Sequence, residues 1–214
     1  MTDPCALLLQ RGCRELGLEI TEFEHDSLMA YLALLAKWNS TYNLTAVRDP
    51  EAMVVRHLLD SLAIAPLVDG QRLIDVGSGG GLPGVPLAIL NPTNEVHLLD
   101  SNSKKTRFLF QVKTALRLDN MVVHHQRVES FKPSQQYDVV LSRAFAGLSE
   151  MVVSSGHLLK TDGVFLAMKG VYPQDELEAV ESLCTIEAVH SVVVPDLDEQ
   201  RHLVRMKALK ASPQ

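Results

Sequence analysis

The sequence holds few cysteines, and none is placed to build a disulfide or zinc framework. Its three cysteines, Cys5, Cys13 and Cys184, are far apart, odd in number and form no C-x-x-C pair. Disulfide-stapled secreted domains carry even numbers of cysteines, and structural zinc sites need clustered ligands. We therefore expect reduced thiols, no metal site and a cytoplasmic protein.

A long hydrophobic run is also missing. The longest, 28-LMAYLALLA-36, is far short of the roughly 20 apolar residues that span a bilayer. The residues after Met1 are Thr2, Asp3 and Pro4, without the basic segment that opens a signal peptide. We expect no membrane partner.

Positive charge is in deficit, since 20 Lys and Arg face 26 Asp and Glu for a net charge of −6. A protein that coats nucleic acid without sequence preference is usually basic, because neutralised phosphates supply most of its affinity. If this chain binds nucleic acid, it does so through a local patch. Apolar residues make up 46% of its 214 residues, enough to fold one large domain or one domain with an extension.

The pattern of apolar residues divides the chain near residue 66. Residues 1–66 carry apolar stripes at helical spacing, and Asp49-Pro50 is typical of a helix start. Residues 67–214 alternate short apolar runs with helix-length segments, which indicates a mostly parallel sheet with helices on both faces. The expected strands are 72–76, 95–100, 121–126, 137–142, 163–169, 185–195 and 201–209.

The last two strands are joined by about five polar residues. So short a connection forces an antiparallel hairpin, because a parallel crossover needs about a dozen residues or more. The sequence thus predicts a Rossmann-like, doubly wound α/β sheet. It ends in an antiparallel hairpin and carries a helical extension at residues 1–66.

Glycines crowd the segment 73-LIDVGSGGGLPGVPLAIL-90, between a predicted strand and a predicted helix. Gly79, Gly81 and Gly84 match the dinucleotide fingerprint G-x-G-x-x-G, whereas in the earlier frame of Gly77 and Gly79 the third position is Leu82. The fingerprint alone is weak, and a tight turn without a ligand is the simplest alternative.

Acidic residues around this loop favour S-adenosylmethionine over a nicotinamide cofactor. Asp75 would repel a pyrophosphate, whereas a sulfonium and an ammonium group suit a carboxylate. Asp100, 23 residues after Gly77, is placed to accept ribose hydroxyls, although it also suits a helix cap. Val128-Glu129 follows the third strand, where a backbone N–H and a carboxylate can meet adenine; alone, Glu129 would be a solvated loop residue. The reversed terminal hairpin also fits the sheet of a Rossmann-like class I methyltransferase better than the all-parallel dinucleotide-binding fold, so we expect the former.

Six runs of residues resemble the bacterial RsmG (GidB) family, and they span nearly the whole chain. The runs are 38-WNSTYNLTAVRDP-50, 56-RHLLDSL-62, 74-IDVGSGGGLPGVPLAI-89, 98-LLDSNSKKTRFL-109, 141-LSRAFAGL-148 and 201-RHLV-204. The resemblance implies transfer of a methyl group from S-adenosylmethionine to N7 of the guanine at nucleotide 527 of 16S ribosomal RNA, within the small ribosomal subunit. Loss of the family's activity is associated with low-level streptomycin resistance.

The same resemblance places the cofactor at Gly77, Leu82, Val128, Glu129 and Arg143. To these the fingerprint and the charge argument add Gly79, Asp75 and Asp100. The chain departs from the family pattern by an extra glycine in the loop and by Gln200, where the family usually has Glu.

Methylation of guanine N7 needs no general base, because N7 offers a free lone pair and loses no proton. The protein must instead hold N7 in line with the methyl carbon and the leaving sulfur, about 3–3.5 Å away, in a dry pocket. Arg143 ends the fourth strand, at the edge where open α/β sheets bind ligands, and is our candidate for this positioning. A surface ion pair is its alternative role.

Candidate contacts to RNA are basic residues near the same edge. For each residue taken alone, an ordinary solvated side chain is at least as good an explanation as an RNA contact. They are Lys104, Arg127, Lys169, Arg201 and His202, with Lys105 and Arg107 beside them.

On the third predicted helix, Asp60 lies four residues after Arg56, a spacing that permits an ion pair. For Arg56, His57 and Asp60 we favour a structural clamp between the amino-terminal helices and the sheet. Two other functions stay open at this point: a nicotinamide-dependent oxidoreductase, and a non-catalytic assembly factor that binds ribosomal RNA.

Overall fold

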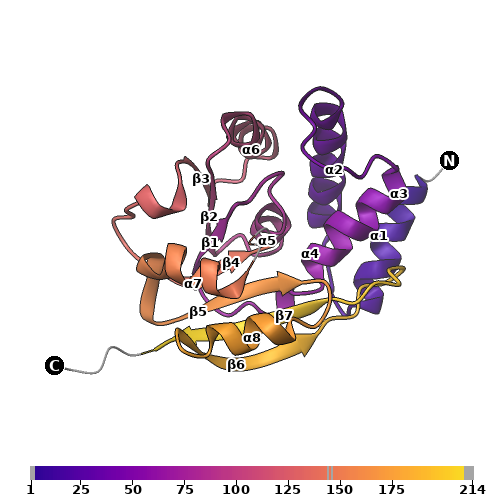
Figure 1. Cartoon of the computed structure of the whole chain (residues 1–214). Helices are drawn as coiled ribbons and strands as arrows, with labels where there is room; N and C mark the ends of the chain where they lie inside the picture. The colour runs from indigo at the N-terminus through magenta and orange to yellow at the C-terminus, as the bar shows by residue number, and fades with distance from the viewer. Residues whose placement is uncertain (1–2, 144, 146, 210–214) are drawn as a thin grey trace.

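The computed structural model of the chain describes residues 3–143, 145 and 147–209. These residues form a seven-stranded sheet in the order β3-β2-β1-β4-β5-β7-β6 (Figure 1). The strands are β1 (Arg72–Val76), β2 (Glu95–Asp100), β3 (Met121–His125), β4 (Tyr137–Ser142), β5 (Leu159–Lys169), β6 (Cys184–Ser191) and β7 (His202–Ala208).

Helices cover both faces of the sheet. They are α1 (Pro4–Glu15), α2 (Glu22–Tyr42), α3 (Pro50–Met53), α4 (Asp60–Leu62), α5 (Gly84–Leu90), α6 (Ser103–Leu116), α7 (Leu148–Ser155) and α8 (Gln174–Val180). Shorter helical segments are η1 (Val54–Leu59), η2 (Ala65–Leu67), η3 (Val128–Ser130) and η4 (Gly156–Leu158).

The sheet confirms the predicted topology. The first five strands run parallel, while β7 is antiparallel to both β5 and β6. Lys169 at the end of β5 pairs with His202 at the start of β7, so the hairpin brings Arg201 to the carboxyl edge of the parallel strands. Two expected strand boundaries were wrong by several residues. β5 begins at Leu159, not at residue 163, because Leu159 pairs with Tyr137 across an irregularity in the register, and β6 ends at Ser191, not at residue 195.

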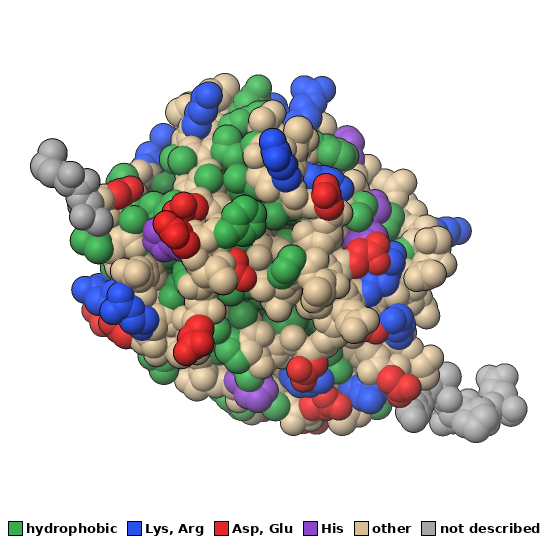
Figure 2. Space-filling model, turned by 180° about the vertical axis from the view of Figure 1, so that it is seen from behind, with side chains coloured by type: hydrophobic (Ala, Val, Ile, Leu, Met, Phe, Trp, Pro, Cys, Tyr) green, Lys and Arg blue, Asp and Glu red, His purple; other side chains and the backbone are tan. Residues whose placement is uncertain are grey.

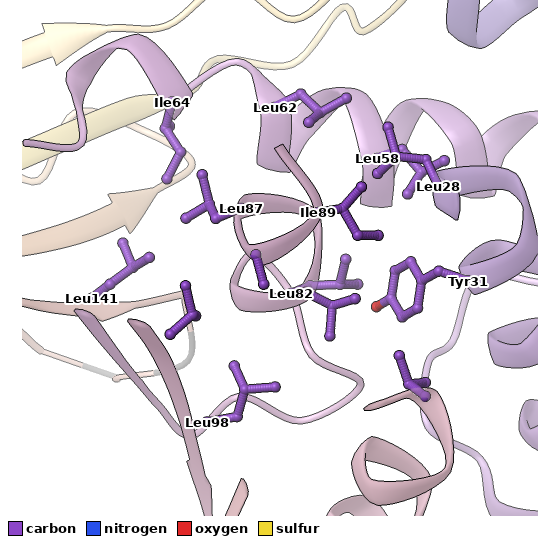
Figure 3. Packing of buried hydrophobic residues seen from close by; sticks show 14 of the residues in the cluster. Leu28, Tyr31, Leu58, Leu62, Ile64, Leu82, Leu87, Ile89, Leu98 and Leu141 are labelled. Carbon is purple, nitrogen blue, oxygen red and sulfur yellow. The ribbon is translucent and has the colours of Figure 1, made fainter. Parts of the chain in front are cut away.

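Helix α5 explains why the amino-terminal helices are needed. Its sequence GVPLAIL is apolar all round, and such a helix is stable only when it is buried all round. One side packs on the sheet, and Figure 3 shows Leu28 and Tyr31 of α2 and Leu58 of η1 closing over the other. Tyr31 also donates a hydrogen bond from its hydroxyl to the carbonyl oxygen of Gly80, at 2.7 Å. The division near residue 66 stays a prediction, but one apolar core runs across it.

The opposite face of the sheet carries a separate apolar core under α7 and α8, which Figure 1 shows on the other side from α1 and α2. Acidic and basic side chains are interspersed on the face seen in Figure 2, so the net negative charge is not gathered there in one patch.

The helix that starts at Pro50 is less regular than its sequence predicts. Asp49 caps it as expected, accepting a hydrogen bond from the N–H of Ala52 at 2.8 Å. Its middle, η1, is a π-helix of six residues that carries Arg56 and His57 and leads directly into Asp60. Apolar spacing cannot distinguish a π segment from an α-helix, and π segments occur often at functional sites.

Candidate functional site

The glycine loop between β1 and α5 is shaped by both backbone conformation and packing. Gly81 has φ 92°, and a Cβ atom there would lie 2.5 Å from Cγ2 of Val85. Gly77 has φ 71° and lines a cavity at the end of β1. The loop therefore needs glycine partly for its own fold and partly because a cavity opens against its main chain.

Asp75 holds this loop from below and does not line the cavity. Its side chain is buried, and Oδ2 accepts a hydrogen bond from the N–H of Gly84, the first residue of α5, at 3.0 Å. Burial raises the pKa of Asp75 to about 7, and Oδ1 has no hydrogen-bond partner. We expected this carboxylate to face a cationic cofactor; in the structure it faces the start of a helix.

A first pocket of about 270 Å³ lies where β1, β2 and β3 end. Asp100 forms one wall, and its two oxygens accept hydrogen bonds from the N–H groups of Gly79 (2.9 Å) and Asn102 (2.8 Å). Each carboxylate oxygen has a second lone pair for a ligand hydroxyl. Val128 and Glu129, in the turn after β3, form the opposite wall.

A second pocket of about 370 Å³ lies where β4 and β5 end and β7 begins. Two residues that follow β4 line different pockets: Arg143 lines the second and Phe145 the first. The ionisable residues of the second pocket are Arg56, Asp60, Arg143, Lys169 and Arg201, with His57 beside them. Four cations and one carboxylate line the pocket, so its lining is mostly basic. Glu199 pairs with Arg56 and Arg201, and Glu176 pairs with Lys169, so four cations face three carboxylates and the local net charge is +1 with His57 neutral.

The carboxylate of Asp60 organises this pocket. Oδ1 accepts a hydrogen bond from Nε of Arg201 at 2.8 Å, and Oδ2 accepts one from Nη1 of Arg143 at 3.3 Å. The helical spacing permits a pair of Arg56 with Asp60, but Arg56 instead donates a hydrogen bond to Glu199 at 2.6 Å. Asp60 nonetheless joins an amino-terminal helix to two segments of the sheet, as a clamp requires.

A family model described as "rRNA small subunit methyltransferase G" matches residues 24–204. The chain belongs to this family. It is 51% identical over 207 residues to the ribosomal RNA small subunit methyltransferase G of Pseudomonas syringae pv. syringae, covering 97% of each chain. The enzyme of the same name from Pseudomonas fluorescens is also 51% identical over 207 residues, again with 97% of each chain covered.

Solved structures agree with the fold. The glycopeptide N-methyltransferase MtfA, complexed with S-adenosylhomocysteine, matches with a TM-score of 0.57 at 12% identity, covering 72% of this chain and 87% of that one. Precorrin-6y C5,15-methyltransferase from Geobacter metallireducens matches with a TM-score of 0.53 at 18% identity, covering 78% and 92%. The family confirms the resemblance seen in the sequence and makes this chain an S-adenosylmethionine-dependent ribosomal RNA methyltransferase.

The residues expected to bind the cofactor fall into three groups in this family member. Gly77, Asp100, Val128 and Glu129 line the first pocket, and Lys105 and Arg127 join them there. Gly79 touches the pocket only through its hydrogen bond to Asp100, and Leu82 is buried in the core. Arg143, expected at both cofactor and target, lines the second pocket. Ala144 and Ala146 of the 141–148 motif lie outside the described residues.

The expected RNA contacts also separate. Lys169 and Arg201 line the second pocket, and His202 lies at its edge with Nδ1 2.9 Å from the carbonyl oxygen of Gly170. Lys104 is exposed at the start of α6 and lines neither pocket.

His57 belongs to the second pocket, although sequence reasoning gave it only a structural role. Nε2 lies 2.9 Å from Oγ1 of Thr45, and burial lowers the pKa of the imidazole. Helical spacing gave no sign of this placement, because the π segment η1 turns Arg56 and His57 differently from an α-helix.

Within the described part of the chain, no group of three or more His, Cys, Asp or Glu side chains is placed to hold a metal ion. His124 lies against His97 instead, with ring nitrogens 2.8 Å apart. No described helix is both long and apolar enough to cross a membrane.

Proposed function

We propose that this enzyme methylates N7 of the guanine at nucleotide 527 of 16S ribosomal RNA within the small subunit, in the cytoplasm. One observation carries the proposal: a pocket lined by four cationic side chains and one carboxylate lies at the same sheet edge as the first pocket, with Arg143 in its lining and Phe145, two residues later, in the lining of the first. A methyl donor held in the first pocket and a nucleotide held in the second would meet there. The resemblance of the sequence motifs to the RsmG family supports guanine 527 as that nucleotide.

The first pocket suits S-adenosylmethionine. Asp100 has lone pairs left for the ribose hydroxyls, and Val128 and Glu129 stand where the N–H of one and the carboxylate of the other can meet the adenine edge. Glu129 is exposed in the present structure, so adenine would give it a partner. When bound, the cofactor supplies the methyl group to be transferred.

Arg143 is proposed to orient the guanine. An Arg side chain that bonds both O6 and N7 of guanine is the commonest way to read this base, but here such a contact would block the nucleophile. We therefore assign Arg143 to O6 alone, which leaves the lone pair of N7 facing the first pocket. Lys169 and the other basic residues of the second pocket would neutralise neighbouring phosphates.

The pocket offers no group that has to accept a proton, in keeping with the chemistry of N7. His57 has its pKa lowered by burial and is neutral near pH 7. Its Nε2 already faces Thr45. We propose that His57 helps shape the pocket and takes no proton from the substrate.

The direct test is transfer of labelled methyl groups from S-adenosylmethionine by the purified protein. The substrates are small subunits and naked 16S RNA from a strain that lacks this gene, and the product is mapped by mass spectrometry of RNA digests. We expect one N7-methylguanine, at nucleotide 527. Absence of transfer to either substrate, with RNA binding retained, would favour an assembly factor. Binding of NADH in place of S-adenosylmethionine in calorimetry would favour an oxidoreductase.

A further inference from the structure

Among the described residues, Asp60 is the one acidic side chain that lines the second pocket, and its surroundings are unusual. The side chain is only 4% exposed, yet it contacts two cations from segments more than 80 residues away in sequence. A buried carboxylate with one cation would be a simple ion pair. One shared between the end of β4 and the start of β7 fixes the two arginines relative to each other.

The two arginines are held to different degrees. Arg201 is 18% exposed and uses three nitrogens within the protein: Nε on Asp60, Nη1 on the carbonyl of Gln200 and Nη2 on Glu199. Arg143 is 31% exposed, and its Nη1 contacts Asp60 and the carbonyl oxygen of Arg56, both at 3.3 Å. The hydrogen bonds of Arg201 within the protein therefore fix its side chain in place. Arg143 is more exposed, and more of its side chain is available to a ligand in the pocket that it lines.

We propose that Asp60 is a positioning residue for methyl transfer: it anchors one edge of the Arg143 guanidinium so that the rest points at the target base. Arg201, fixed by Glu199, keeps Asp60 in place. The inference rests on the proposed function, because it assigns Asp60 a part in orienting the guanine.

A positioning role for Asp60 predicts a fall in kcat without a rise in KM. The loss of an ion pair that is merely structural would not produce this separation. Asp60→Asn removes the anchor and leaves the pocket one unit more positive. The variant pocket attracts RNA phosphates at least as strongly as the unaltered pocket does, but the guanidinium of Arg143 is no longer held in its orientation. We expect kcat to fall by about 30-fold or more, since a displacement of about 1 Å can cost about 100-fold, while KM for small subunits does not rise.

Two further variants keep the test decisive. Asp138→Asn is the matched control, because Asp138 binds Lys160 and the N–H groups of Gln71 and Arg72 at the opposite end of the sheet. Asp138→Asn should keep kcat and KM within about twofold of the values of the unaltered protein, because substitutions far from a site usually have small effects on it. The double variant Asp60→Asn with Arg201→Gln removes the buried carboxylate together with its half-buried partner, so Arg201 is not left as a cation facing an uncharged side chain at position 60, and it guards against misfolding of the single variant. Its kcat should stay as low as that of Asp60→Asn, because Arg143 is still unanchored.

The experiment measures initial rates of methyl transfer to small subunits that lack the modification, alongside cofactor affinity by calorimetry. Cofactor affinity should be unchanged within about twofold in all variants, since Asp60 lies outside the first pocket. Near-normal kcat in folded Asp60→Asn, or recovery of kcat in the double variant, would overturn the inference. Inactivity of the unaltered protein in the same assay would instead overturn the proposed function.

Discussion

The two pockets at the carboxyl edge of the sheet are built from different materials. The first is lined mainly by residues at or just after the ends of the successive strands β1, β2 and β3, such as Gly77, Asp100 and Val128. The second uses long charged side chains from four segments far apart in sequence, one of them in the amino-terminal helices. The comparison teaches that the first pocket follows from the α/β sheet itself, whereas the second depends on the amino-terminal helices and the terminal hairpin packed around that sheet. Under the proposed function, the first would hold the methyl donor and the second the target.

The largest effect should come from Arg143, which tests whether the pockets act separately. Arg143→Ala removes the group assigned to O6 of guanine and should lower kcat by about 100-fold or more, with cofactor affinity nearly unchanged. Rates of methyl transfer to small subunits and calorimetry with S-adenosylmethionine measure the two quantities. Arg205→Ala, which removes an arginine paired with Glu187 on the β6–β7 hairpin, is the control. If Arg143→Ala lost a comparable amount of cofactor affinity, Arg143 would also belong to the cofactor site, and the two pockets would not act separately.

Asp100 should give the converse result in the first pocket. Asp100→Ala removes the proposed acceptor of the ribose hydroxyls and the bond to the N–H of Gly79, so the dissociation constant for S-adenosylmethionine should rise about tenfold or more. Calorimetry measures it, and binding of small subunits should change little. Asp162→Ala, at an exposed carboxylate, is the control. An unaltered cofactor affinity would remove Asp100 from the binding site.

Lys169 should have a smaller, salt-dependent effect. It lines the second pocket and pairs with Glu176 at 2.7 Å. Lys169→Gln should raise KM for small subunits about three- to tenfold and lower the slope of log affinity against log salt by about one. Lys160→Gln, at the opposite end of the sheet, should change neither value. An unchanged salt slope in Lys169→Gln would mean that Lys169 does not neutralise a phosphate.

The smallest effect on either pocket is expected at Asp75. Burial raises its pKa to about 7 from an ordinary value near 4, so the folded state binds its proton more tightly than the unfolded state does. The ionised, buried carboxylate of Asp75 therefore lowers the free energy of unfolding. This loss is absent below pH 4, where Asp75 is protonated in both states, and grows until about pH 7. Relative to the unaltered protein, Asp75→Asn should gain on the order of 2–4 kcal/mol in free energy of unfolding between those pH values.

Urea unfolding of both proteins at pH 5 and pH 8 measures this difference, and calorimetry should find cofactor affinity changed less than about threefold. A large loss of affinity would restore the role that the sequence suggested, in which Asp75 attracts the cationic end of the cofactor.

The sequence predicted what strand order and local motifs determine. In a parallel sheet, residues that follow successive strands meet at one edge, so the position of Asp100, Val128 and Glu129 around one cavity could be expected. The same rule, with the predicted hairpin, brings Arg143, Lys169 and Arg201 to a second cavity. Which ligand each residue touches stays a prediction.

What the sequence did not predict depends on side-chain direction and on long-range contacts. Asp60 and Arg56 have helical spacing for an ion pair. In the structure, the buried carboxylate of Asp60 instead accepts hydrogen bonds from two arginines distant in sequence, and Arg56 donates a hydrogen bond to Glu199. The π segment η1 has no signature in apolar spacing. Asp75 alternates with its neighbours on β1, yet only the packed α5 shows that its carboxylate meets a helix start.

The most direct test of the account is the modification state of 16S RNA in cells. We would compare, by mass spectrometry, RNA from a strain that lacks this gene, from that strain complemented with the unaltered protein, and from that strain complemented with Arg143→Ala. The account predicts that N7-methylguanine at nucleotide 527 is absent without the gene, restored by the unaltered protein and not restored by Arg143→Ala. Persistence of the methyl group in the deletion strain would contradict it.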